Sequence, residues 1–412
     1  MNKLATPKVP IFLFFVLPFA GLIAAVRSYK AVNAKNMVWL FIIFYGFTFV
    51  YTNHQMDANR YAKSLIYLYK QPVNSASDFF SLLYSKESNY VDLLQPLLTF
   101  LVSRFTDDPR ILFTFFGVIF GYFYSRNIWF LFSFVKNKVK REALPFIIMA
   151  AFAISIWQMN GFRFWTAAHV FAYGFFLFLS GKPIRGLVIS LASILVHFSF
   201  IFPVIVLLIY VIAGNRLFIY FILYILSFFI SVVTPTTFSG YTKSLPGVFQ
   251  ERTDRYTSKA YLKRLDKAAT VKVNWYIEGR LAAIRLAINF LLVITMINYR
   301  KFLNTRKVEL SLLSFSLLIG SVVNVLSSVP SVHRFYFLFY LLIFSFFFLL
   351  VQGMRERTFR WWVKAPVFIA ILLFVVVEFR VGFDTMGVMT LIGNPLTAPF
   401  IQDEAPLINL IR

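Results

Sequence analysis

The stretch from Trp157 to Ser199 places three polar side chains where apolar segments end. Asn160 and Arg163 lie in a short turn between two apolar segments, and His197 ends a third one, which follows the basic turn GKPIR. Because cytoplasmic loops of membrane proteins carry an excess of Lys and Arg, we expect the GKPIR turn in the cytoplasm. Asn160, Arg163 and His197 would then emerge on the opposite face, at one depth. Cations and hydrogen-bonding groups gathered at one depth predict a site for an anionic ligand.

Two other segments carry similar side chains at the ends of apolar runs. MDANRY contains Asp57 and Arg60, and VHRFY contains His333 and Arg334. A guanidinium group matches phosphate oxygens in a bidentate fashion and stays charged when partly desolvated, so these arginines suit a pyrophosphate in a low-dielectric cleft. The faces of neighbouring Tyr and Trp rings suit sugar rings. The candidate glycan-binding residues are Tyr61, Asn160, Trp165 and Tyr336.

Each candidate also has a purely structural explanation. Arg60 and Asp57 are three residues apart and would form an ordinary ion pair on one helical turn. Arg163 and Arg334 would anchor helix ends at the membrane interface. His197 would only stabilise a bend in its helix. A functional site is favoured because all of these residues fall on one side at one depth.

Two further arginines lie at the start of the apolar segment 279–298. Arg280, near Tyr276 and Glu278, can face the outer side and assist in holding a diphosphate. Arg285 lies about one turn deeper. Because an uncompensated charge inside the membrane is costly, its position indicates a partner or a ligand.

The composition excludes an ordinary soluble protein. The 412 residues are 59% hydrophobic and 20% aromatic, which leaves too little polar surface to cover a soluble fold. The chain has no cysteine, and its four histidines are too scattered for a zinc motif, so we expect neither a metal nor another cofactor. The net charge of +24 indicates positive-inside topology and contact with anionic membrane lipids, or a polyanionic ligand such as a lipid diphosphate. No nucleic acid is expected, because no soluble basic domain is present to bind it.

Long apolar runs predict an all-α, polytopic helical membrane protein with a single transmembrane domain over residues 1–412. Placing the basic clusters in the cytoplasm requires an even number of crossings between GKPIR and Arg300. The long run 186–213, with His197 and Pro203 near its middle, is therefore expected to bend at His197 into two short helices. The prediction is about twelve spans, with both ends outside. The runs lie at 10–26, 37–52, 110–134, 144–159, 164–180, 186–213, 217–234, 279–298, 310–326, 335–352 and 365–381.

Two sizeable outer loops follow from this topology, at 53–93 and 235–278. The second contains eight Lys or Arg residues, which opposes the positive-inside trend and calls for a reason. Segment 90–105 is expected to form a re-entrant or interfacial helix on the outer side. Irregular backbone at such depths is tolerated only where protein or water covers it, which indicates a cavity.

Several motifs resemble those of polysaccharide polymerases of the O-antigen polymerase (Wzy-type) and EpsG-like kind. They are MDANRYAKSL, DLLQPLLTFLVSRFTDDPRILFTFFGVIFG, NGFRFWTAAHVFAYG, LVHFSFIFPV and SVHRFYF, spread from about position 55 to 340. Arg163 and Gly174 also fit an Arg-x10-Gly spacing described for some O-antigen polymerases, as do Arg110 and Gly121.

The resemblance implies a multi-pass enzyme of the bacterial inner (cytoplasmic) membrane with a GT-C-like fold. Such enzymes transfer a glycan chain from undecaprenyl diphosphate onto a lipid-linked oligosaccharide repeat unit at the periplasmic or outer face. They work in many pathways with a chain-length regulator (co-polymerase).

The chemistry of this transfer suits the candidate residues. Arginines can stabilise the charge of a departing lipid diphosphate without a metal, so a metal-independent glycosyltransferase is expected. The arginines expected to hold the diphosphate are Arg60, Arg163, Arg280 and Arg334. His197 or Asp57 would accept the proton of the acceptor hydroxyl or orient that hydroxyl, with Arg163 also counted as catalytic.

Three alternatives remain. An O-antigen ligase would use the same membrane plan and much the same residues. A non-enzymatic flippase for lipid-linked oligosaccharides would want cations along the full depth of the span, whereas here they gather at one face. A membrane O-acetyltransferase would need a histidine facing the cytoplasm, and the predicted topology places none there.

Overall fold

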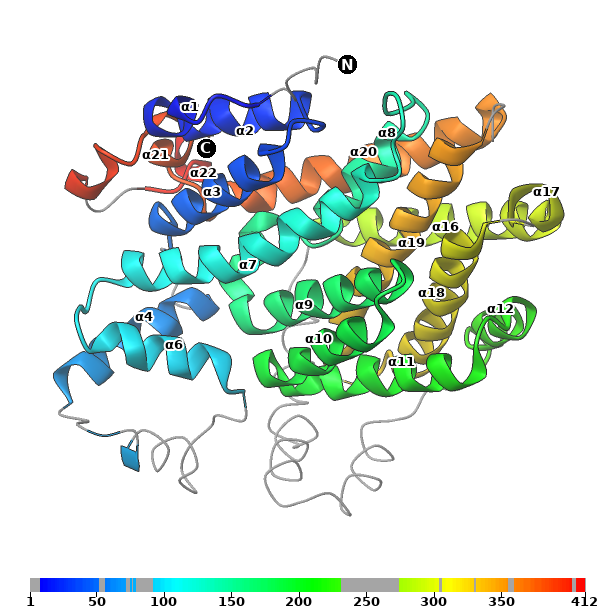
Figure 1. The fold of residues 1–412 in the computed structure, drawn as a ribbon, viewed down its shortest axis with the longest axis horizontal. Coiled ribbons are helices and arrows are strands. Elements are labelled where there is room, and N and C mark those ends of the chain that lie inside the picture. The colour runs from blue at the N-terminus through cyan, green and yellow to red at the C-terminus, as the bar shows by residue number, and fades with distance from the viewer. Residues whose placement is uncertain are drawn as a thin grey trace, which may run out of the picture. The chain divides into compact units, whose positions relative to one another are not determined.

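The computed structural model describes residues 8–51, 56–71, 75, 77–78, 92–230, 274–303, 306–329, 331–354, 359–401 and 405–411. All regular elements within these residues are helices, and the β-type pairing there is limited to two isolated bridges (Figure 1). This confirms the predicted all-α class; the GT-C-like arrangement stays a prediction. The chain divides into two compact units. Unit 1 comprises Met1–Lys138, Ile154–Ile201 and Glu378–Arg412, and unit 2 comprises Val139–Ala153 and Phe202–Val377.

Six described segments are long and apolar enough to cross a membrane. They are Pro109–Phe132, Leu144–Leu179, Trp275–Ile297, Lys307–Val325, Val332–Gly353 and Trp361–Gly382. Six shorter apolar helices of 10–17 residues accompany them. The chain is therefore a membrane protein, and the count of about twelve spans stays a prediction.

Unit 1 is built from helices of three parts of the chain. In chain order they are α1 (Phe12–Val16), α2 (Pro18–Arg27), α3 (Ala34–Phe47), α4 (Asp57–Lys70), α6 (Leu94–Ser103), α7 (Pro109–Phe132), η1 (Ile156–Gly161), α9 (Phe162–Leu179), α10 (Pro183–Val196), η2 (Phe198–Phe200), α21 (Val388–Ile392), η4 (Ala398–Phe400) and α22 (Ile408–Ile411).

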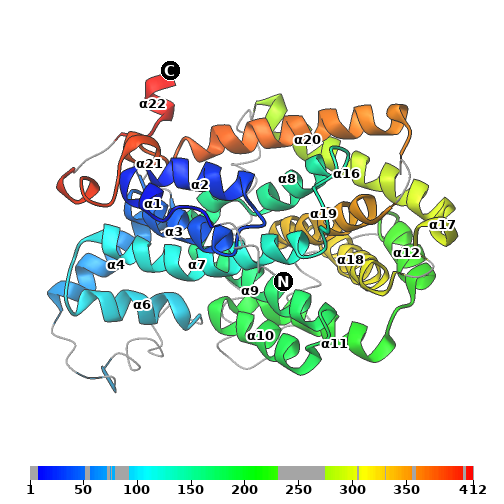
Figure 2. The same cartoon turned by 45° about the horizontal axis from the view of Figure 1, so that its top comes forward.

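Small residues let the long helices of unit 1 approach closely. α3 and α7 lie side by side and antiparallel (Figure 2). A Cβ on Gly117 would come within 2.6 Å of the Ile42 carbonyl oxygen. α9 and α10 meet in the same way, since a Cβ on Gly174 would lie 2.6 Å from the Gly186 carbonyl oxygen. Close backbone approach at small residues is a common way of packing membrane helices, and it explains why glycine stands at these positions.

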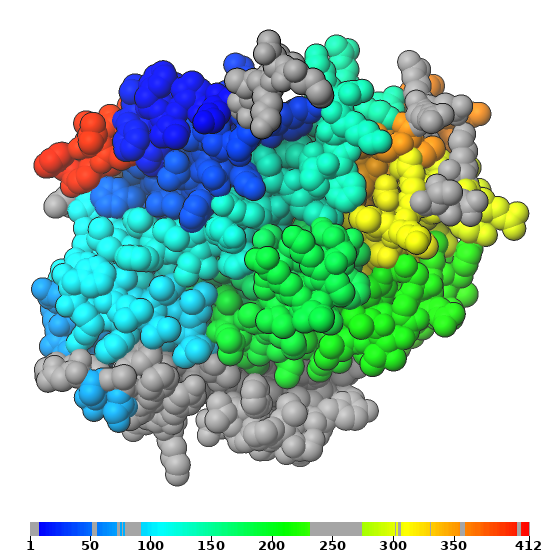
Figure 3. Space-filling view, in the orientation of Figure 1, coloured from blue at the N-terminus to red at the C-terminus, as the bar shows by residue number. Residues whose placement is uncertain are grey.

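The long apolar run 186–213 is broken as the sequence predicts. α10 ends at Val196, His197 adopts an extended backbone, and α11 (Ile201–Ala213) begins after the short helix η2. α10 also exposes a row of apolar side chains at helical spacing, and this part of the chain forms green surface in Figure 3. They are Ile184, Val188, Leu191 and Leu195. Such a row is expected on a helix that faces lipid.

The C-terminal segment folds back onto α3. The hydroxyl of Tyr45 lies 2.8 Å from that of Thr385, and the hydroxyl of Thr48 lies 2.9 Å from that of Thr390. The backbone N–H of Val50 donates to the Thr385 carbonyl at 3.1 Å. This segment is thus a packed part of unit 1.

Unit 2 is organised around α19, most of whose residues are buried. Helices from distant parts of the chain, among them the helices at 144–153 and 307–325, pack against it. The helices of unit 2 are α8 (Leu144–Ala153), α11, α12 (Leu217–Leu226), α16 (Trp275–Ile297), α17 (Tyr299–Leu303), α18 (Lys307–Val325), η3 (Val332–Arg334), α19 (Phe335–Gly353) and α20 (Trp361–Gly382), which passes into unit 1 at Glu378.

Candidate functional site

A buried aspartate joins three segments of unit 1. The side chain of Asp92 is fully buried, and its Oδ2 accepts a hydrogen bond from Nη1 of Arg163 at 3.0 Å. Its Oδ1 accepts the backbone N–H of Phe198 at 2.9 Å. The next residue, Leu93, donates its backbone N–H to the Leu195 carbonyl at 3.0 Å. Asp92, which lies just before α6, therefore connects the start of α9 to the backbone that follows α10.

His197 lies in this break, and its hydrogen bonds define the state of its ring. Nδ1 accepts the backbone N–H of Ser199 at 3.2 Å and lies 2.9 Å from the Ser199 hydroxyl. Because a backbone N–H can only donate, Nδ1 carries no proton there, and Nε2 of the neutral ring must carry it. The ring packs edge-on against Phe164, with 5.5 Å between centroids. His197 is thus arranged to donate a hydrogen bond from Nε2.

Asn160 caps the helix that carries Asp57. Met56 stands at the N-cap of α4 and supplies no side-chain cap, but Oδ1 of Asn160 accepts the backbone N–H of Ala58 at 3.1 Å. A Cβ on Gly161 would lie 3.8 Å from Oδ2 of Asp57, so Asp57 is also close to the start of α9. These contacts define what we call the Asp92 cluster: Asp57, Asp92, Asn160, Arg163 and His197.

The Asp92 cluster lies at the end of its helices that is opposite to the basic residues. α9 begins beside Arg163 and ends just before Lys182, and α10 runs back from the same basic turn to His197. The positive-inside rule accordingly predicts that the cluster faces the outside. Within unit 1, the structure therefore brings together the residues that the sequence places at one depth.

Three other predicted residues of unit 1 lie beside the cluster in different environments. The side chain of Arg60 is 69% exposed and forms an ion pair with Asp57. Tyr61 is buried, with its ring edge-on against a phenylalanine of α7 at 5.6 Å. Trp165 is also buried, edge-on against the preceding phenylalanine at 4.9 Å. Both rings contribute to the packing of unit 1, and their role in glycan binding stays a prediction.

Unit 2 contains a cavity of about 180 Å³ whose wall is part polar and part apolar. Asn324 holds this wall together, because its Nδ2 donates to the Ser227 hydroxyl at 2.8 Å and its Oδ1 accepts the Tyr336 hydroxyl at 2.9 Å. The cavity, here called the Arg285 pocket, is lined by groups that include Tyr224, Ser227, Arg285, Asn289, Asn324 and Tyr336.

Arg285 is the cation of this pocket. Its guanidinium carbon lies 4.3 Å from the centroid of the Tyr336 ring, and its Nε donates to the Tyr340 hydroxyl at 3.3 Å. Among the described residues no carboxylate forms an ion pair with Arg285. A guanidinium whose neighbours are phenol rings keeps its full positive charge, so an anion that enters the pocket would meet an uncompensated cation.

The other residues of unit 2 that the sequence predicts to bind the substrate lie in α16, η3 and α19. Arg280 is buried, with its guanidinium carbon 5.5 Å from the centroid of the Phe374 ring. Arg334 is half-buried in η3, just after Ser331, whose φ of 69° is a left-handed conformation. Tyr336 is buried in the wall of the Arg285 pocket. The assignment of Arg280 and Arg334 to a diphosphate stays a prediction.

Sequence reasoning gave two residues less weight than the structure does. Asp92 is a carboxylate in an apolar stretch, and this signal alone could have marked it as a candidate. Arg285 lies deeper in its apolar segment than Arg280, and that depth is the signal for a functional role. Most of the predicted outer loop 235–278 lies outside the described residues, as do residues 79–91 of the loop 53–93. Within the described part of the chain, no three His, Asp or Glu side chains gather as a metal site would require.

Comparison with known proteins identifies one family. Comparisons with curated proteins and with solved structures gave no match. The model of the EpsG family matches residues 38–389, which include every residue of the Asp92 cluster and of the Arg285 pocket. Since the match covers most of the chain, this protein belongs to the EpsG family.

Proposed function

We propose that this membrane protein is a polysaccharide polymerase. It transfers a growing glycan from undecaprenyl diphosphate onto a lipid-linked repeat unit, at the outer face of the bacterial inner membrane. Membership of the EpsG family is consistent with a polymerase of this kind. The observation that carries the proposal is the Arg285 pocket, where a cation on an apolar helix meets hydroxyl and amide groups and no carboxylate of the described residues.

In this proposal, Arg285 binds the diphosphate of the lipid carrier. The leaving group gains negative charge as the bond from sugar to phosphate breaks, and a fixed guanidinium in a low-dielectric site stabilises that charge. Arg280 and Arg334 of the same unit add positive charge. No metal is needed for this stabilisation, so the transfer should proceed in the presence of a chelator.

The Asp92 cluster of unit 1 handles the acceptor glycan. His197 donates a hydrogen bond from Nε2 to a sugar oxygen, and the carboxylate of Asp57 accepts a hydrogen bond from a sugar hydroxyl. Arg163, held by Asp92, and the amide of Asn160 orient the sugar. A chain-length regulator is the expected protein partner.

The test is conversion of purified lipid-linked repeat units into a ladder of longer products by the full chain in lipid nanodiscs. The decisive variant is Arg285→Met, and its matched control is Arg300→Met. Arg300 also donates from Nε to a tyrosine hydroxyl at 3.3 Å, but it does not line the Arg285 pocket. We expect loss of about 100-fold in ladder formation for Arg285→Met and little change for the control.

The same assay separates the alternatives. A ligase would leave repeat units unextended until another acceptor is supplied, and a flippase would form no glycosidic bond at all. Equal activity of Arg285→Met and the unmodified protein would refute the assignment of the diphosphate to the Arg285 pocket.

A further inference from the structure

Unit 1 contains a cavity of about 770 Å³, which is larger than the Arg285 pocket and whose lining includes none of the residues assigned above. It is formed by the end of α3, the start of α7 and the C-terminal segment, and the polar groups on its wall include Tyr51, Asp107, Asp108, Arg110 and Asn409. Its size falls within the range of cavities that bind small organic molecules.

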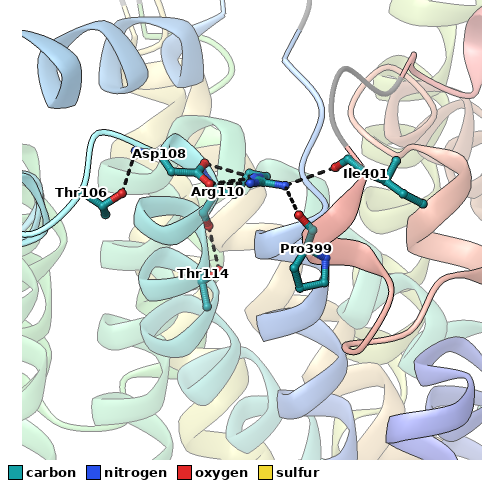
Figure 4. A network of polar contacts seen from close by, with 6 residues as sticks. All are labelled: Thr106, Asp108, Arg110, Thr114, Pro399 and Ile401. Carbon is teal, nitrogen blue, oxygen red and sulfur yellow. Dashed lines mark hydrogen bonds and ion pairs between the residues drawn. The ribbon is translucent and has the colours of Figure 1, made fainter.

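Arg110 is fully engaged in holding this cavity together (Figure 4). Its Nε and Nη2 donate to the carboxylate of Asp108, at distances from 2.6 to 3.1 Å. Its Nη1 donates to the carbonyl oxygens of Pro399 and Ile401 at 3.3 and 3.2 Å. All three guanidinium nitrogens therefore have protein partners, and Arg110 ties the C-terminal segment to α7 without offering its charge to a ligand.

The charge that remains in the cavity is negative. Although burial alone would raise the pKa of Asp108, its hydrogen bonds to Arg110 and the charge of that residue lower the pKa below the usual value. The pair is therefore ionised at neutral pH and has no net charge. Asp107 is exposed beside it, and no group of the described residues pairs with its carboxylate. This carboxylate disfavours an anionic ligand and accepts hydrogen bonds from hydroxyl groups.

The other polar groups suit the same kind of ligand. The amide of Asn409 is exposed and can both donate and accept hydrogen bonds. Tyr51 lines the cavity together with the aromatic rings of Phe47 and Phe49. A carboxylate, an amide and a phenol around an aromatic wall match the alternating hydroxyl groups and apolar faces of a sugar.

The cavity also lies at the predicted outer end of its helices. At the other end of α3 and α7, Nζ of Lys30 donates to the Lys136 carbonyl at 2.8 Å, so the basic residues there are neighbours. The positive-inside rule places that end in the cytoplasm and the cavity on the outside.

We propose that this cavity is a binding site for the uncharged, hydroxyl-bearing part of a glycan, separate from the place where the diphosphate binds. The inference rests on the proposed function in one respect, namely that the protein encounters a glycan on its outer face. The site would hold sugars of the substrate or of the product chain away from the reacting bond.

Binding of soluble trisaccharides to the full chain in lipid nanodiscs, measured by saturation-transfer NMR, tests this proposal without any need for polymerase activity. The probes are a trisaccharide of glucose, one of N-acetylglucosamine, one of a uronic acid, and inorganic pyrophosphate. We expect binding of an uncharged trisaccharide, with affinity reduced about tenfold or more by Asp107→Ala, because a hydrogen bond to a charged group is lost. Ala405→Trp should abolish the part of the binding that depends on Asp107, since Ala405 lines the cavity and is exposed.

Leu396→Trp serves as the matched control, because it adds a tryptophan to the same C-terminal segment at an exposed position that does not line the cavity. The proposal is overturned if no uncharged trisaccharide binds, if Asp107→Ala leaves the affinity unchanged, if the Asp107-dependent binding survives Ala405→Trp, or if pyrophosphate binds and is displaced by that substitution. If the protein still forms a product ladder when any of these results is obtained, the proposed polymerase activity stands and only the assignment of this cavity is wrong.

Discussion

Two arginines on apolar helices, Arg163 in unit 1 and Arg285 in unit 2, have opposite electrostatic environments. Arg163 forms an ion pair with the fully buried carboxylate of Asp92. Arg285 lies over the ring of Tyr336 and donates to the Tyr340 hydroxyl. The first arrangement is neutral as a whole, whereas the second keeps a net charge of about one unit.

This difference separates positioning from binding. A guanidinium that is already bonded to a buried carboxylate holds segments in place, and it attracts a further anion only weakly because the two charges cancel. A guanidinium among phenols is attracted only modestly by its neighbours, by about 0.5–2 kcal/mol, so it is available to a ligand anion. The sequence analysis assigns Arg163 to the diphosphate and gives Arg285 only an unspecified partner or ligand, while their surroundings favour Arg285.

Removal of the carboxylate should have the largest effect. Asp92→Ala leaves the charge of Arg163 and the Phe198 N–H without their buried partner, so we expect a loss of about 3–5 kcal/mol in the free energy of unfolding. Reversible unfolding in detergent micelles measures this loss. The double variant Asp92→Leu with Arg163→Leu should regain much of it, because no uncompensated charge remains.

Asp57→Ala is the control for this prediction, since it removes a carboxylate from an exposed ion pair of the same unit. It should cost less than about 1 kcal/mol. Equal losses for Asp92→Ala and Asp57→Ala would mean that the Asp92 cluster is not held by its buried carboxylate.

Pyrophosphate binding should distinguish the two arginines directly. Saturating pyrophosphate is expected to raise the thermal midpoint of the unmodified protein, because a ligand that binds only the folded state stabilises it. The shift should vanish in Arg285→Met and persist in the Asp92→Leu, Arg163→Leu double variant. If the shift persisted in Arg285→Met and vanished in the double variant, the diphosphate would bind to Arg163 of unit 1 instead.

The parts of this picture that the sequence predicts are those that depend on local pattern. The break at His197 follows from an apolar run too long for one span, with a histidine and Pro203 in its middle. The common depth of Asn160, Arg163 and His197 follows from the basic turn between their helices. Both are visible because hydropathy and charge are read along the chain.

The parts that the sequence does not predict depend on partners far apart in the chain. Asp92 and Arg163 are separated by 71 positions, and no spacing rule links them. Tyr61 suits a sugar by residue type, yet its ring is buried against α7, because an aromatic side chain on an amphipathic helix serves packing equally well. The difference between Arg163 and Arg285 lies entirely in such neighbours.

His197 gives a smaller prediction, which tests whether its ring acts as a hydrogen-bond donor from Nε2. His197→Gln keeps an N–H donor and should lose about tenfold or less, whereas His197→Leu should lose more.

Arg60→Ala should have the smallest effect. Its side chain is 69% exposed, and its partner Asp57 is a residue of the same helical turn, so the pair should contribute less than about 0.5 kcal/mol to the free energy of unfolding. Ladder formation should change by less than about twofold, because an exposed guanidinium bound to a carboxylate resembles Arg163 more than Arg285. A loss as large as that of Arg285→Met would show that an exposed ion pair can open to bind the diphosphate, and the surroundings in the unliganded protein would then be a poor guide to which arginine the substrate uses.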